Sequence, residues 1–98
     1  MNLQALMKQA QSMQKNLMAS KEKIEAMEFT GTSELVEVKM SGKKEVISVK
    51  IKETELEKDD IEILEDMIVI AMNDAINKVN KEIEAKMGSQ ASGLQGLF

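Results

Sequence analysis

Apolar residues recur along the first part of the chain at alternating intervals of three and four positions. The members of this series are Leu3, Leu6, Ala10, Met13, Leu17, Ser20, Ile24 and Met27, of which Ser20 alone is polar. Such heptad spacing indicates a helix with one apolar seam. The pattern predicts a helix from about Leu3 to Met27, roughly 37 Å long at ~1.5 Å per residue. A compact domain of about 100 residues has a radius of gyration of only about 13 Å. We therefore expect part of this helix to project beyond the core or to cross onto another subunit.

The middle of the chain changes from helical to alternating periodicity. Residues 35–40 and 46–51 each place apolar side chains at mostly alternate positions, and Ser41 and Gly42 between them indicate a turn. This pattern predicts a β-hairpin with one buried face, and a short strand around residues 27–32 is a candidate third member. Because a hairpin alone is marginally stable, we expect a helix to cover its apolar face.

A second helix is predicted from about Asp59 to Met87. Asp59 is a plausible N-cap, with Glu62 three residues later as in a capping box, and Gly88 is a stop signal. Residues 64–72 are apolar on almost all sides, whereas residues 73–86 keep a single apolar stripe. We expect the first half to lie between the sheet and a partner chain. The second half should face the first helix and leave its other sides in water.

The composition limits how such a fold is stabilised. The chain has 98 residues and contains neither Cys nor His, so a disulfide is excluded and most transition-metal sites are disfavoured. A domain this small is often marginal alone, and we therefore expect a homo-oligomer. One domain should span residues 1–98, with residues 88–98 as a flexible tail. The absence of a signal peptide or a long apolar run suggests a cytoplasmic protein that does not enter a membrane.

Candidate enzyme chemistry is sparse. An acidic cluster precedes and begins the second helix, and its members are Asp59, Asp60, Glu62, Glu65 and Asp66. It could bind a hard cation, but it lacks the spaced ligands of a calcium loop, and a solvated helix start is the better interpretation. Gly42 and Lys43 do not form a phosphate-binding loop because the glycine-rich frame is missing. The sequence thus predicts no enzyme, no metal site and no cofactor.

Lysines are the remaining candidates. The net charge is −4, yet residues 1–24 carry four lysines against one acidic residue, while residues 54–75 carry eight acidic residues against one lysine. Lys8 and Lys15 lie one heptad apart and opposite the seam, and Lys78 and Lys81 are neighbours on the second helix. These ammonium groups could contact phosphates or simply form a soluble surface. The chain has no Arg, and its aromatic residues are two Phe, so any nucleic-acid contact should be to duplex phosphates with weak sequence preference.

Two helical segments resemble the YbaB/EbfC family of nucleoid-associated proteins. The first is Leu6-Met-Lys-Gln-Ala-Gln-Ser-Met-Gln, and the second runs from Leu64-Glu-Asp-Met to Ala71-Met-Asn-Asp-Ala. Thr30-Gly31 and a closing Gly96-Leu97-Phe98 follow the same order. The resemblance covers nearly the whole chain, although this sequence lacks Arg and has a short segment between Gly31 and Leu35.

The resemblance implies an α+β fold in which two long helices flank a three-stranded antiparallel sheet, assembled as a tweezer-like homodimer. It also implies a bacterial protein of the nucleoid that holds duplex DNA between projecting helical arms. Carried over by position, the DNA-binding residues are Lys8, Lys15, Lys78, Lys81 and Lys86. The resemblance further implies a role in nucleoid organisation, gene regulation or recombination and repair. Members of the family are commonly encoded beside recombination-repair genes, so recombination-repair proteins are expected as further partners. The alternative is a protein-interaction adaptor or chaperone-like helical module without significant DNA binding.

Overall fold

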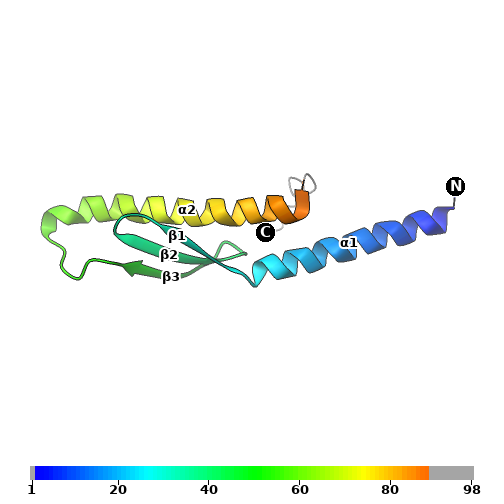
Figure 1. Ribbon diagram of the computed structural model, residues 1–98, viewed down its shortest axis with the longest axis horizontal. Coiled ribbons are helices and arrows are strands. Elements are labelled where there is room, and N and C mark those ends of the chain that lie inside the picture. The colour runs from blue at the N-terminus through cyan, green and yellow to red at the C-terminus, as the bar shows by residue number, and fades with distance from the viewer. Residues whose placement is uncertain (1, 89–98) are drawn as a thin grey trace.

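A computed structural model describes residues 2–88 and confirms the α+β architecture (Figure 1). Its elements in chain order are α1 (Leu3–Glu25), β1 (Glu28–Thr32), β2 (Val36–Ser41), β3 (Val46–Ile51), the 3₁₀ turn η1 (Lys58–Asp60) and α2 (Ile61–Met87). The molecule is elongated, with extents of 71 × 19 × 16 Å. The expected tail lies outside the described residues, apart from Gly88.

The three strands form an antiparallel sheet in the order β1-β2-β3, so the candidate third strand is confirmed. Val38 lies opposite Gly31 on one side and opposite Val49 on the other, and the β2–β3 register shifts between Lys39 and Met40. In the turn between β2 and β3, Lys44 adopts a positive φ of 64°. A lysine therefore occupies a left-handed position that glycine or asparagine would adopt at lower cost.

The core lies between α2 and the first two strands. Its buried residues are Ile24, Val36, Val38, Met40, Ala71, Ala75, Val79, Ile83 and Met87. The alternating residues of β2 supply one side, and a stripe along α2 supplies the other. Gly31 permits this contact, because a Cβ at that position would lie only 2.1 Å from the Ala71 carbonyl oxygen. The small residues of β1 and α2 thus let strand and helix approach closely.

The expected burial of the second hairpin strand is wrong for the single chain. All six residues of β3 are exposed, including Val49 at 47% and Ile51 at 40%. The cause is the position of α2, which packs mainly against β1 and β2 and leaves β3 as an uncovered edge (Figure 1). The first half of α2 is also partly uncovered, with Ile63, Val69 and Ile70 exposed.

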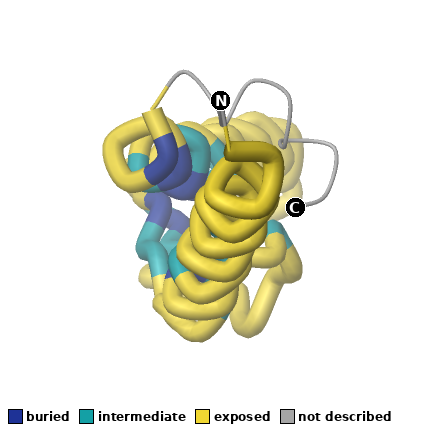
Figure 2. The backbone as a smooth tube through the Cα atoms, turned by 90° about the vertical axis from the view of Figure 1, so that its right-hand side faces the viewer, coloured by how far each residue is buried: buried dark blue, intermediate teal, exposed yellow. Residues whose placement is uncertain are grey.

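The first helix extends away from the rest of the molecule, as its predicted length suggested. Asn2 caps it by accepting a hydrogen bond from the Gln4 backbone N–H through Oδ1 at 3.1 Å, and it ends at Glu25, two residues before the expected end. Ile24 is the one buried residue of α1, and Leu17 packs against the core cluster. Residues 2–16 are all exposed, so more than half of the helix lies beyond the core (Figure 2).

Two details of α2 differ from expectation. Asp59 is not the N-cap, because it lies within η1. The observed capping interaction is at the start of η1, where the Glu57 backbone N–H donates to Asp60 Oδ2 at 2.9 Å. The stripe on the second half of α2 does not mainly face α1. It packs on the sheet, and contact with α1 is confined to the last turns before Gly88.

Candidate nucleic-acid interface

The projecting part of α1 presents two lysines to solvent. Lys8 and Lys15 are exposed and stand seven residues apart, a rise of about 10 Å along one side of the helix. They occupy the heptad position opposite the Leu3–Leu17 seam, so they point away from its apolar side chains. Within residues 2–88 neither forms an ion pair. Their charge is therefore uncompensated by neighbouring carboxylates.

Lys78 is held in place by the sheet. Its Nζ donates to the Thr30 carbonyl oxygen at 2.7 Å and lies 3.1 Å from Asp74 Oδ2. The same Asp74 oxygen accepts the Thr32 backbone N–H at 2.9 Å. The Thr32 hydrogen bond, followed by that from Lys78, lowers the pKa of Asp74 from its ordinary value. The Lys78 side chain is about half exposed, but a phosphate must compete with the Asp74 carboxylate for its ammonium group.

The two lysines further along α2 differ from each other. Lys81 is exposed and has no ion pair in the part of the chain that the structure describes. Lys86 lies 3.9 Å from Glu82, one turn before it on α2, and this distance makes the pair a loose one. Of the three α2 candidates, Lys81 is the one most available to a phosphate.

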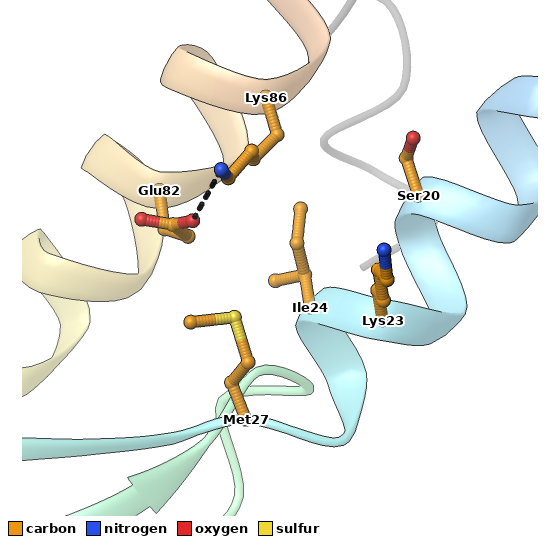
Figure 3. Close-up of a pocket in the computed structure, with 6 residues that line it drawn as sticks. All are labelled: Ser20, Lys23, Ile24, Met27, Glu82 and Lys86. Atoms are coloured by element: carbon orange, nitrogen blue, oxygen red, sulfur yellow. Dashed lines mark ion pairs between the residues drawn. The ribbon is translucent and has the colours of Figure 1, made fainter.

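A hollow of about 450 Å³ lies where α1 meets the end of α2. Ile24 and Met27 supply its apolar side chains, while Ser20, Lys23, Glu82 and Lys86 supply its polar ones (Figure 3). Lys23 was not among the sequence-predicted candidates. The sequence feature that could have identified Lys23 is that it directly precedes Ile24, a seam residue that packs where the two helices meet.

The predicted lysines are spread along the long axis of the molecule. The first turns of α1, which carry Lys8, lie well beyond the end of α2 (Figure 1). Lys15 is closer to α2, because its neighbours Met13 and Asn16 line a hollow with Lys86. Chain separation concealed the contact between Lys78 and Thr30, since these residues are 48 positions apart. An elongated partner with repeated negative charge would match this spacing better than a single small anion.

Other kinds of site are not found in the described part of the chain. Residues 2–88 contain no group of three or more Asp or Glu side chains placed to hold a metal ion. No helix among these residues is long and apolar enough to cross a membrane. The candidate site that is left is a set of lysines on the helices of a small α+β protein, and two of them, Lys8 and Lys15, lie on an exposed arm formed by residues 3–16 of α1.

Comparison with known proteins identifies the family. Residues 1–94 match the YbaB/EbfC DNA-binding family, and the chain belongs to it. A nucleoid-associated protein of Lachnoclostridium phytofermentans is 44% identical over 95% of this chain and 80% of its own length. Those of Enterococcus faecalis and Ligilactobacillus salivarius are 36% and 34% identical, over 98% and 99% of this chain and 94% and 95% of their own lengths. The family is a DNA-binding family and not an enzyme family, which confirms the resemblance seen in the sequence.

Proposed function

We propose that this protein binds duplex DNA as a homodimer, through phosphate contacts from lysines on its projecting helices and with little sequence specificity. The observation that carries the proposal is the exposed arm of α1, on which Lys8 and Lys15 share a face and lack ion-pair partners among the described residues. Lys81 joins them from α2. Lys78 and Lys86 contribute less, because each must first leave a carboxylate. Nucleoid organisation, gene regulation and recombination or repair are the roles such binding would serve.

The homodimer is inferred from apolar surface that the single chain leaves open. The uncovered side chains on β3 are Val46, Ile47, Val49 and Ile51, and those on the first half of α2 are Ile61, Ile63, Val69 and Ile70. Both sets lie at the end of the molecule remote from the start of α1 (Figure 1). An edge strand with exposed apolar residues invites pairing with another chain. A second copy covering this end would leave both arms free.

The salt dependence of binding follows from the number of contacts. If Lys8, Lys15 and Lys81 of two chains each neutralise one phosphate, six counterions are displaced. The logarithm of the association constant should then fall with the logarithm of salt concentration with a slope of about −5. This slope is modest, in keeping with a chain that carries a net charge of −4.

A salt titration of charge variants tests the arm directly. Lys8→Gln combined with Lys15→Gln removes four contacts from a dimer and should reduce the slope to about −2, with at least tenfold weaker binding at low salt. Lys58→Gln is the matched control, because Lys58 lies in η1 at the start of α2, away from the arm. An unchanged slope in the double variant would exclude the arm as the DNA contact.

A protein-interaction module remains the second candidate, and one observation favours it. The arm also exposes apolar seam residues, with Leu6 at 45% and Met13 at 46%. An adaptor would grip its partner by these side chains instead of by the lysines. Leu6→Gln would then abolish binding of a stoichiometric protein partner, whereas duplex DNA would not be retained at physiological salt by any variant.

A further inference from the structure

The seam of α1 is covered along only part of its length. Near its C-terminal end, Leu17 and Ile24 pack against the core, and Met87 at the end of α2 lies beside Leu17. The same seam continues toward the N-terminus of α1, beyond the described end of α2 (Figure 1). There Leu3 is 70% exposed and Leu6 is 45% exposed. Met13, at 46%, lies at the border of the open part, because it lines a hollow with Leu17 and Met87. The exposed arm, residues 3–16, is about as long as an isolated helix that is only marginally stable in water. A partner on the seam would therefore stabilise it.

We propose that the open seams of two copies of this chain pair antiparallel, so that their arms join and the lysines of each arm face outward. The flanking heptad positions support a second copy as the occupant. These positions are Met7, Gln9, Gln14 and Asn16, and all are uncharged. Two identical arms can therefore meet without bringing like charges together, whereas Lys8 and Lys15 stay on the far side.

Packing selects the antiparallel orientation. In a parallel pair, Ala10 would face Ala10 and leave a gap, and the ends of both α2 helices would compete for the same space beside Leu17. In an antiparallel pair, Leu6 faces Ala10 of the other chain, and Leu3 faces Met13. The two central layers then each pair a large residue with a small one, which fills the gap that a parallel pair would leave, and the two cores lie at opposite ends of the joined arms. Antiparallel helix dipoles also favour this arrangement.

Paired arms could hold two duplexes at once. This bridging step rests on the proposed DNA binding, whereas the pairing of the arms does not. Paired arms place the Lys8 and Lys15 faces of the two chains on opposite sides of a rod about two helix diameters, or roughly 20 Å, across. One duplex could lie against each side. Because β3 and the start of α2 are remote from the arm, dimers joined through those surfaces could be linked further through their arms.

The paired surface is small, which sets the conditions of the experiment. A seam from Leu3 to Met13 is about 16 Å long and would bury roughly 300 Å² per chain, far below the ~800 Å² typical of a stable interface. The arms should therefore pair weakly in dilute solution. They should pair readily on DNA, where binding raises their effective concentration.

Disulfide trapping tests the pairing and its orientation, because the native chain has no cysteine. Full-length Leu6→Cys and Ala10→Cys chains, one carrying a mass tag, are mixed and oxidised with and without duplex DNA. We expect mixed disulfides to exceed self-disulfides at least fivefold, because antiparallel pairing puts these two Cα atoms within reach of a disulfide. Lys8→Cys is the control and should form few links. Preferential self-linking of Leu6→Cys, or no mixed link at high protein concentration, would overturn the proposal.

Two further measurements distinguish a second copy of this chain from other occupants of the seam. A chain carrying both Ala10→Cys and Leu97→Cys should not form an internal disulfide; if it does so efficiently, the chain's own last residues cover the seam and the proposal fails. Native mass measurement of the trapped Leu6→Cys and Ala10→Cys mixture should show assemblies larger than two chains. Mixed disulfides confined to two-chain particles would exclude the linkage of separate dimers.

A capture assay tests the bridging step. Protein is added to bead-bound duplex, and retention of a second, labelled duplex is measured. Leu6→Gln combined with Met13→Gln should keep affinity for one duplex within about twofold but reduce capture of the second at least tenfold. Wild-type protein that binds one duplex and captures no second would refute bridging. Wild-type protein that binds no duplex would refute the proposed function instead, and the disulfide result would still decide the pairing.

Discussion

The contact between Gly31 and α2 yields a sharp stability prediction. A Cβ at Gly31 would lie 2.1 Å from the Ala71 carbonyl oxygen, 2.5 Å from the Ala75 backbone nitrogen and 2.7 Å from the Ala75 Cβ. Two of these atoms belong to the backbone, so no side-chain rotation relieves the overlap. The helix must move away from β1 by about 1 Å, which loosens the packing of α2 on the sheet. We expect Gly31→Ala to lower the free energy of unfolding by about 3 kcal/mol.

Urea denaturation followed by circular dichroism, at one fixed protein concentration, measures this loss. Gly88→Ala is an informative control, because its Cβ would meet nothing within 4 Å while its φ of 61° disfavours a side chain. It should cost only about 1 kcal/mol, from backbone strain alone. A Gly31→Ala variant that loses less than 1 kcal/mol would show that β1 and α2 are not in close contact.

Two further substitutions probe local features of the fold. Lys44→Asn should raise the free energy of unfolding by about 0.5–1 kcal/mol, because asparagine tolerates the left-handed φ of this turn better than lysine, and a loss measured in urea would contradict the turn geometry. Asp74→Asn should destabilise the protein at pH 7. Because the folded pKa of Asp74 is lowered, its stabilisation is present above the ordinary pKa of about 4 and is lost as pH falls through the folded value. The stability difference between wild type and Asp74→Asn should therefore narrow in acid, and a constant difference across pH 3–7 would exclude the ionised carboxylate as its source.

Local periodicity predicted the elements of this fold better than it predicted their surroundings. The heptad series located α1 to within two residues, and alternation located β3, because both patterns are properties of a single segment. Burial of β3 could not be predicted in the same way. An alternating apolar strand requires a cover, but its sequence does not say whether a helix of the same chain or another chain provides it.

The candidate lysines show the same limit. Exposure of Lys8 and Lys15 follows from their place opposite the seam, and the structure agrees. The engagement of Lys78 by Thr30 and Asp74 depends on how α2 docks against β1, which no spacing along the helix reveals. Sequence thus identified the cations on the arm, whereas tertiary packing decides which of those on α2 are free to bind phosphate.

The acidic net charge does not oppose DNA binding by the arm, because the charges are segregated in space. The acidic segment around η1 and the start of α2 lies at one end of a molecule 71 Å long, and the first turns of α1 lie at the other (Figure 1). At physiological ionic strength, interactions between exposed charges are largely screened beyond about 8 Å. A duplex on the arm would therefore experience mainly the local lysines and little of the distant carboxylates. The same segregation would orient the protein, with its acidic end directed away from the DNA and its arm toward it.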